Sequence, residues 1–418
     1  MSERMSTNPY KGVRDFYPAD WARLSALFER IRDTLATWGY EEYNASPLER
    51  AELYEAKTSE EIVNEQTYTF LDRGERSVTL RPEMTPTLAR MVASKRRELA
   101  LPLRWFSIGN RFRYERPQKG RLREFYQADI DLVGLPEGEA DIEIVCLAVK
   151  VLTDLGATDK DFVIRINSRP LLNVACRAAG LKGEAVKQYL RLLDKKSRIP
   201  SEEFASASAA LAEKDPLTFI DPNAMKEMLA ELKSRGVGNV VFDAGITRGF
   251  DYYTGMVFEI YDTDPANPRA LFGGGRFDQL IAMFGGDTIP AVGFALGDVT
   301  LVDFLGTHGI TLDTSADKPQ LYLGTPKPEN ISAAQAFATE LRAKGSRVFV
   351  NLTDKNLGDQ IKDVVKRGIP LFVAYGADEV ASGTVRMKTL ATGEETKLSV
   401  SELSAYLQSS FRPPVSGL

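Results

Sequence analysis

The segment from residue 104 to 134 constrains the fold of this chain more than any other, because two long strand-like runs flank a loop there. Successive side chains along a strand point to opposite faces of the sheet. Sorted in this way, one face of the pair is apolar, and the other carries mostly charged and polar groups: Arg111, Arg113, Glu115, Phe125, Gln127, Asp129 and Asp131. The segment therefore predicts two antiparallel strands, at 104–115 and 124–134, with one face packed on a core.

The loop of this hairpin is strongly basic, since six of the thirteen residues from 111 to 123 are Arg or Lys. The whole chain has 53 basic and 58 acidic residues, so it is not a general polyanion binder. The ordinary interpretation is a solvated face with cross-strand charge pairs. The strand spacing, however, brings Arg113 close to Phe125 and Gln127, which predicts a floor for a flat ring beside an anion. Because arginine forks match phosphate oxygens, we expect a nucleotide.

The chain contains a single histidine, His308. Sites that need two or more histidines, such as common catalytic zinc centres, are therefore excluded. A serine–histidine–aspartate triad would have to use His308, but no nucleophile elbow is evident, and we expect this side chain to be solvated in a loop. Chemistry must rest on arginines, carboxylates, tyrosines and the backbone, which favours phosphoryl or nucleotidyl transfer.

The cysteines and the hydropathy pattern indicate the compartment. Cys146 and Cys176 form neither a metal-binding set nor a disulfide framework, which is typical of a reducing cytoplasm. The N-terminal segment has no apolar signal region, and no apolar run reaches the roughly eighteen residues of a membrane span. We therefore expect a cytoplasmic protein with no membrane contact.

A length of 418 residues predicts more than one domain. The patterns before residue 312 predict a helix at 20–38 capped by Asp20, a hairpin at 67–80 and a second helix at 139–156. They also predict a polar helical insertion at 169–236 and a glycine turn at 271–280. After a linker, strands and helices alternate β-α-β-α-β, which predicts a compact domain with a largely parallel sheet. The expected domains are 1–312 and 318–418.

Several motifs resemble those of class II aminoacyl-tRNA synthetases, in the form found in the histidyl-tRNA synthetase family. The segments are "FRYERPQKGRLREFYQADIDLVG" (motif 2), "RGFDYYTGMVFE", "FGGGRFDQL" and "LRPEMTPTLAR", and Pro47 stands where motif 1 keeps its dimer-interface proline. They follow the family's order over nearly the whole chain. The resemblance implies an α+β fold: a class II antiparallel sheet flanked by helices, a small helical insertion, and a C-terminal α/β anticodon-binding domain.

The resemblance also implies an activity and a set of site residues. The expected reaction is ATP-dependent activation of L-histidine and its transfer to tRNA(His) by a homodimer, through a histidyl-adenylate, with Mg²⁺ on the ATP phosphates. Arg113 and Arg248 would be catalytic. The ATP site would comprise Arg113, Glu115, Arg121, Phe125 and Arg276. The amino acid would be bound by Glu83, Met84, Thr85, Gln127, Asp131, Tyr252 and Tyr253. Arg116 and Gln118 would contact the tRNA.

Two positions depart from the family pattern. Thr300 occupies the place of an arginine that lies on the adenine ring, so either Arg276 supplies the missing cation or the adenine is held differently. Met84 stands where many members have glycine.

Two other functions remain open at this point. One is a non-catalytic paralogue, the regulatory subunit of ATP phosphoribosyltransferase, and the other is a small-molecule ligase of class II type that never contacts tRNA. The regulatory subunit is disfavoured by the C-terminal domain and by the presence of Arg113, Arg248, Tyr252 and Tyr253. The small-molecule ligase is disfavoured by the C-terminal domain.

Overall fold

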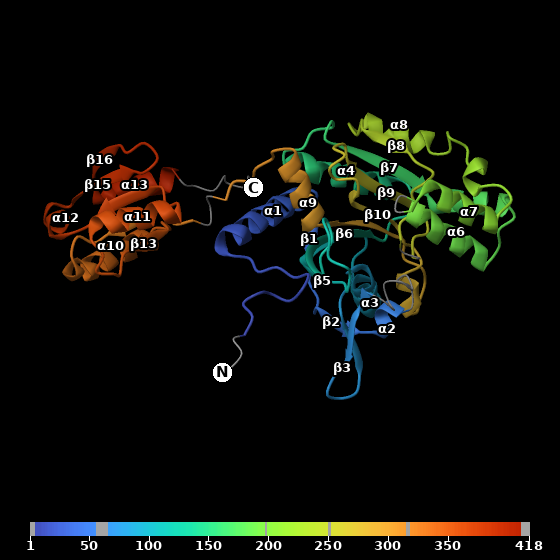
Figure 1. Ribbon diagram of the computed structural model, residues 1–418, viewed down its shortest axis with the longest axis horizontal. Coiled ribbons are helices and arrows are strands. Elements are labelled where there is room, and N and C mark those ends of the chain that lie inside the picture. The colour runs from blue at the N-terminus through green and yellow to red at the C-terminus, as the bar shows by residue number, and fades with distance from the viewer. Residues whose placement is uncertain (1–4, 56–65, 197–198, 250–251, 315–317, 411–418) are drawn as a thin grey trace. The chain divides into compact units, whose positions relative to one another are not determined.

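The computed structural model describes residues 5–55, 66–196, 199–249, 252–314 and 318–410, and the chain divides into two units, Met1–Leu312 and Asp313–Leu418 (Figure 1). Each unit has a sheet and a hydrophobic core of its own. No helix within these ranges is long and apolar enough to cross a membrane.

The first unit is built on an eight-stranded sheet. In spatial order its strands are β1 (Glu41–Glu42), β5 (Leu103–Phe112), β6 (Glu124–Val133), β11 (Ala291–Gly297), β10 (Ala270–Arg276), β9 (Met256–Asp262), β7 (Phe162–Ser168) and β8 (Val240–Phe242). The end strands β1 and β8 run parallel to their neighbours, and the pairs between β5 and β7 are all antiparallel. The predicted class of antiparallel sheet is therefore confirmed. The expected glycine turn is wrong, because those glycines lie inside β10.

Four helices contribute buried side chains to the main core against this sheet: α1 (Pro18–Thr37), α4 (Glu139–Asp154), α8 (Lys226–Ser234) and α9 (Asp298–Thr307). Helix α1 presents Leu24, Leu27, Ile31 and Leu35 to the core at helical spacing. The predicted N-cap at Asp20 is wrong. The helix begins at Pro18, where a missing N–H removes no helical hydrogen bond and the fixed φ suits the first turn.

The smaller elements of this unit include the predicted hairpin and the predicted helical insertion. A three-stranded sheet contains β2 (Leu48–Arg50), β4 (Ser77–Leu80) and β3 (Tyr68–Leu71), and the last two form the predicted hairpin. Helices α2 (Glu52–Glu55) and α3 (Thr85–Lys95) flank it. The insertion consists of α5 (Arg169–Ala178), α6 (Glu184–Lys195), α7 (Ser201–Leu211) and α8 (Lys226–Ser234), and the first three pack around a small core of their own.

Strand β5 ends at Phe112, three residues before its predicted end. The chain leaves the sheet there because two backbone N–H groups bond elsewhere. The N–H of Tyr114 donates to Gln66 O at 2.6 Å, and the N–H of Glu115 donates to Arg113 O at 2.7 Å. Consequently Arg113 lies just beyond the strand, and Arg111 is the residue directly opposite Phe125.

His308 is not the solvated loop residue that we expected. It caps the C-terminal end of α9, and its side chain is 16% exposed. Its Nε2 lies 2.8 Å from an oxygen of Asp262, and Nδ1 lies 3.2 Å from Asp161. The ring is thus held between two carboxylates and is not part of a nucleophilic triad.

The second unit contains the predicted β-α-β-α-β pattern. Parallel strands lie in the order β13 (Val348–Val350), β12 (Leu321–Gly324) and β14 (Leu371–Ala374), with helices α10 (Ile331–Ala343) and α11 (Leu357–Arg367). An antiparallel hairpin that we did not predict, β15 (Thr384–Thr389) and β16 (Glu395–Ser399), extends the sheet from β14. Helices α12 (Ala377–Ser382) and α13 (Val400–Ser410) complete the unit.

The close approach of β10 to β11 generates a stability prediction. A Cβ on Gly274 would lie 2.0 Å from Gly293 O and 2.6 Å from the Cα of Phe294. We expect Gly274→Ala to lower the free energy of unfolding by about 3 kcal/mol, because backbone atoms must move. Urea unfolding followed by tryptophan fluorescence reports this unit alone, since all three tryptophans lie in it.

The control is Gly306→Ala in α9, where nothing lies within 4 Å of the added Cβ. This variant should be neutral or more stable by up to about 1 kcal/mol, because alanine favours a helix. Equal stability of the two variants would contradict the account.

Candidate active site

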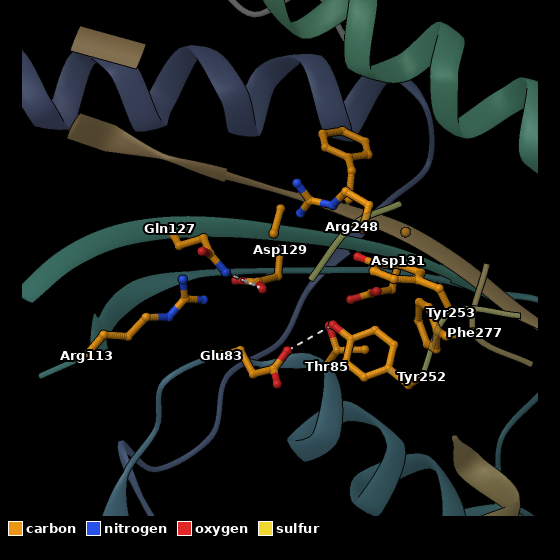
Figure 2. A pocket seen from close by; sticks show the side chains of 13 residues that line it. Glu83, Thr85, Arg113, Gln127, Asp129, Asp131, Arg248, Tyr252, Tyr253 and Phe277 are labelled. Atoms are coloured by element: carbon orange, nitrogen blue, oxygen red, sulfur yellow. Dashed lines mark hydrogen bonds between the residues drawn. The ribbon is translucent and has the colours of Figure 1, made fainter. Parts of the chain in front are cut away.

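A polar pocket of about 100 Å³ opens on the face of the large sheet that carries Gln127, Asp129 and Asp131 (Figure 2). These three residues alternate along β6 with Ala128, Ile130 and Leu132, which are buried in the main core. The residues that line the pocket are Glu83, Thr85, Arg113, Gln127, Asp129, Asp131, Arg248, Tyr252, Tyr253, Phe277, Gly293, Phe294 and Ala295.

Small residues occupy the middle of this face, because the register of β10 and β11 places Gly273 opposite Ala295 and Gly275 opposite Gly293. A Cβ on Gly293 would lie 2.3 Å from Asp131 Oδ1, and one on Gly275 would lie 2.9 Å from the Tyr253 ring. The glycines therefore let larger polar and aromatic side chains lie directly against the strands.

The pocket contains several hydrogen-bond acceptors. Tyr252 donates its hydroxyl to the carboxylate of Glu83 at 2.9 Å, and Figure 2 shows the two side chains meeting at one side of the pocket. Gln127 donates its Nε2 to Asp129 at 2.7 Å. This bond uses one of the two N–H groups and fixes the orientation of the amide, so the carbonyl oxygen of Gln127 can accept from a ligand.

Asp131 is buried, and among the described residues its Oδ2 has no hydrogen-bond partner. Burial raises its pKa well above the usual range, the neighbouring Asp129 raises it further, and Arg111 acts in the opposite direction. A cation in the pocket would favour the ionised form of this carboxyl, because it would supply the missing opposite charge.

Two guanidinium groups reach the pocket from outside the strands. Arg113 donates its Nε to Pro82 O at 3.0 Å and lies over the ring of Phe125, 5.2 Å from its centroid. Arg248 donates from Nη1 to Glu259 at 3.0 Å. Burial acts to lower the pKa of Arg248, but Tyr253 and Glu259 outweigh it and raise that pKa, so the side chain stays cationic.

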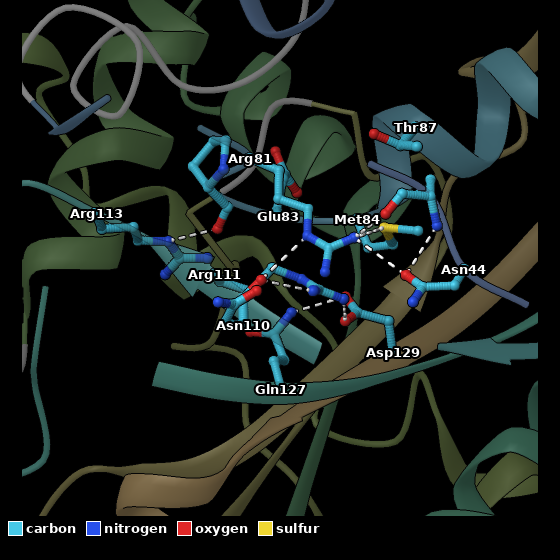
Figure 3. A network of polar contacts seen from close by, with 12 residues as sticks. Asn44, Arg81, Glu83, Met84, Thr87, Asn110, Arg111, Arg113, Gln127 and Asp129 are labelled. Carbon is cyan, nitrogen blue, oxygen red and sulfur yellow. Dashed lines mark hydrogen bonds and ion pairs between the residues drawn. The ribbon is translucent and has the colours of Figure 1, made fainter. Parts of the chain in front are cut away.

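A buried polar network lies behind the pocket (Figure 3). Arg111 donates to Asp129 at 2.6 Å, and the two side chains are 0% and 2% exposed. Arg81, also buried, donates from Nε to Asn110 O at 3.1 Å and from Nη1 to Ala45 O at 2.8 Å. Burial, and then Arg111, lower the pKa of Arg81 to about 10. The network ties the loop that begins at Arg81 to β5 and to the segment before β2.

Several residues expected in the site lie outside the pocket. Met84 is fully buried, and its sulfur lies 3.7 Å from Nη1 of Arg81. Glu115 pairs with Arg121 at 3.4 Å in the hairpin loop. The remaining loop residues expected in the site, Arg116 and Gln118, do not line the pocket either, and Gln118 forms a β-bridge with Arg121.

Arg276 is not brought to the pocket. Its guanidinium donates to both oxygens of Asp141, to Asp278 Oδ1, and to the carbonyls of Leu135 and Pro136. These bonds use all five N–H donors, and the side chain is only 1% exposed, so Arg276 presents neither a donor nor a free face to an adenine ring. Thr300, where the family arginine is absent, donates its hydroxyl to Leu271 O at 2.7 Å.

Sequence reasoning missed five residues that line the pocket: Asp129, Phe277, Gly293, Phe294 and Ala295. Asp129 had a usable signal, because it alternates with Gln127 and Asp131 on the same face. The small residues of β11 had a weaker signal, since only the strand register places them beside β6.

Comparisons with known proteins match both units. The family model described as histidyl-tRNA synthetase matches residues 12–217 and 199–300, and the anticodon binding domain model matches 320–410. The chain is 38% identical to the histidine–tRNA ligase of Leptospira biflexa, with 96% of this chain and 97% of that protein aligned. The chain is 35% identical to the histidine–tRNA ligase of Opitutus terrae, with 96% of this chain and 98% of that protein aligned. The crystal structure of a histidyl-tRNA synthetase from Nostoc has the same fold, with a TM-score of 0.76, 23% identity, and coverage of 97% of this chain and 100% of that one.

Asp131 generates a pH-dependent stability prediction. Folding raises the pKa of this carboxyl above its ordinary value of 3.8. As the pH rises from 3.8 towards the pKa in the folded protein, the unfolded chain loses the proton first, so the free energy of unfolding falls. The loss of stability then persists at higher pH. Asp131→Asn removes this cost. We therefore expect the variant to gain stability relative to the wild type as pH rises from about 4 to about 8 in urea unfolding.

The control is Asp159→Asn, because Asp159 is exposed and forms no ion pair with the other described residues. Its stability difference from the wild type should stay nearly constant over the same pH range. A constant difference for Asp131→Asn as well would contradict the account of its burial.

Proposed function

This chain belongs to the histidyl-tRNA synthetase family, and from that premise we propose that its pocket activates L-histidine with ATP for transfer to tRNA(His). In the first step the carboxylate of histidine attacks the α-phosphorus, the bond to the bridging oxygen breaks, and pyrophosphate leaves. In the second step a hydroxyl of the terminal ribose attacks the histidyl carbonyl, and AMP leaves. Each step is a displacement that needs charge stabilisation and positioning from the protein.

One observation carries this proposal, namely that the pocket combines acceptors for a cation with donors for an anion. Glu83 and the carbonyl oxygen of Gln127 suit an α-ammonium group. Arg113 and Arg248 suit a carboxylate or a phosphate. An α-amino acid beside a nucleotide phosphate requires both kinds of group at once.

The arginines would act mainly in the transition state. As the carboxylate oxygen approaches, negative charge grows on the α-phosphate oxygens and on the leaving pyrophosphate. Arg113 and Arg248 would neutralise that charge, and both are already held by neighbours before a ligand binds. Such preorganisation lowers the barrier because little reorientation remains for the reacting step.

The amino acid would lie among the acids and the tyrosines. We propose that Glu83, Thr85, Gln127 and Asp131 bind its amino and backbone groups. The tyrosines 252 and 253 would contact the imidazole. Burial raises the pKa of both tyrosines, so their hydroxyls stay protonated. The hydroxyl of Tyr252 donates to Glu83, so its oxygen would accept from the imidazole N–H. A buried polar lining of this kind disfavours isosteres that leave it unpaired.

The nucleotide would extend from Arg113 toward the hairpin loop. Phe125, under the Arg113 guanidinium, would stack on the adenine, and Glu115 would contact the adenine or its amino group. Arg121, paired with Glu115, would reach pyrophosphate oxygens. The part of the chain that the structure describes has no group of three or more His, Cys, Asp or Glu arranged to hold a metal. We propose that Mg²⁺ comes with ATP, bound mainly by phosphate oxygens and water.

Two macromolecular contacts are part of the proposal. The C-terminal unit would bind the tRNA anticodon, supported by the family match over 320–410, and the hairpin loop with Arg116 and Gln118 would meet the acceptor end. A homodimer is supported by exposed apolar side chains on the three-stranded sheet: Leu48, Phe70 and Leu71 are 47%, 49% and 67% exposed. The two free cysteines are consistent with the cytoplasm.

The proposed chemistry predicts a large effect at Arg113. We expect Arg113→Ala to lower kcat for histidine-dependent ATP–pyrophosphate exchange by roughly 10²- to 10³-fold, because a charge-stabilising donor is lost. The control is Arg23→Ala on α1, where the side chain is 71% exposed and activity should not change.

The wild-type protein separates the competing functions in the same assay. Histidine-dependent exchange followed by charging of tRNA(His) is the expected result. Absence of exchange would contradict the synthetase and favour a regulatory paralogue. Exchange without transfer to tRNA would favour a small-molecule ligase.

A further inference from the structure

Arg248 is held by one carboxylate, that of Glu259 on β9. Its Nη1 lies 3.0 Å from Oε1 of Glu259, and the two side chains are 18% and 15% exposed. The backbone of Arg248 has φ of 61°, which is uncommon for a residue other than glycine. Such a backbone persists where surrounding contacts hold it, and it is found most often at functional sites.

The register of the sheet explains why Glu259 can reach Arg248. Glu259 lies directly opposite Gly273 on β10, on the same face as the pocket. A Cβ on Gly273 would lie 3.2 Å from Nη1 of Arg248, so the guanidinium passes over the space that glycine leaves open. Nη2 lies 3.4 Å from Gly273 O, which adds a second point of support.

Glu259 is itself fixed by a second set of contacts away from the pocket. Tyr261, two residues along β9, donates its hydroxyl to Oε2 of Glu259 at 2.5 Å. The guanidinium of Arg165 lies 4.5 Å from the centroid of the Tyr261 ring and pairs with Asp243 at 3.0 Å. Each oxygen of Glu259 therefore has a different partner, and only one of the two faces Arg248.

We propose that Glu259 is a positioning residue that holds the Arg248 guanidinium in its reactive orientation before the ligands bind. It does not itself line the pocket, so it acts through Arg248. The proposal rests on the proposed function, because it assigns Arg248 to the reacting phosphate. A purely structural salt bridge would instead stabilise the fold without changing the turnover of the folded protein.

The test is a double-mutant cycle on histidine-dependent ATP–pyrophosphate exchange. We expect Glu259→Ala to lower kcat about 10- to 100-fold, as loss of an orienting partner typically does, with KM for histidine changed less than about twofold. In an Arg248→Ala background, Glu259→Ala should cause no further loss. Glu259→Gln keeps an acceptor oxygen for Arg248 and should retain most of the activity.

The chain offers a closely matched control in Glu143. This residue pairs with Arg104 at 2.8 Å, its side chain is 21% exposed, and it accepts a hydrogen bond from Tyr40 at 3.1 Å. It lies outside the pocket. Glu143→Ala should therefore reduce thermal stability as much as Glu259→Ala does, while kcat stays unchanged.

Crystal structures of the wild-type and Glu259→Ala proteins without ligands complete the test. The Arg248 guanidinium should lose its place over Gly273 in the variant. Unchanged kcat in Glu259→Ala, or losses that add fully in the double variant, would overturn the proposal, as would an unmoved guanidinium. If the wild type showed no exchange, the proposed function would fail, and the crystal structures alone would decide whether Glu259 holds Arg248.

Discussion

The ion pair between Arg111 and Asp129 is the interaction on which the site depends. It joins β5 to β6 beside the pocket, which Asp129 also lines, at 2.6 Å and almost without solvent exposure. Because one partner alone would leave an uncompensated buried charge, breaking such a pair costs about 3–5 kcal/mol. Asp129 also holds the amide of Gln127, so one buried carboxylate contacts both an arginine of β5 and an acceptor of the pocket.

Much of the fold follows from local patterns in the sequence. The alternation at 104–134 predicts the central hairpin, since an apolar stripe of period two can only be buried by a sheet face. The same alternation places Gln127, Asp129 and Asp131 together on the other face. Motif resemblance suggested four residues from different segments of the chain, and the structure brings them to one pocket: Glu83, Arg113, Arg248 and Tyr252. Periodicity alone contains no information about that meeting.

The features that the sequence did not predict depend on contacts between segments that are far apart in the chain. Arg276 was a reasonable choice as a free cation, but its guanidinium is fully used by Asp141, far along the chain, together with Asp278 and the carbonyls of Leu135 and Pro136. The early end of β5 depends on Gln66, whose approach no local pattern indicates. The glycines of β10 read as a turn, because only their neighbours on β9 and β11 show that a flat, small-residue strand is required there.

The central claim is that the pocket binds a zwitterionic amino acid and a nucleotide phosphate in one fixed arrangement. A crystal structure of the protein with L-histidine and ATP tests it most directly. The account predicts the ammonium group at Glu83 and Gln127, with the α-phosphate between the guanidinium groups of Arg113 and Arg248. An amino acid bound elsewhere, or an α-phosphate that contacts neither arginine, would contradict it.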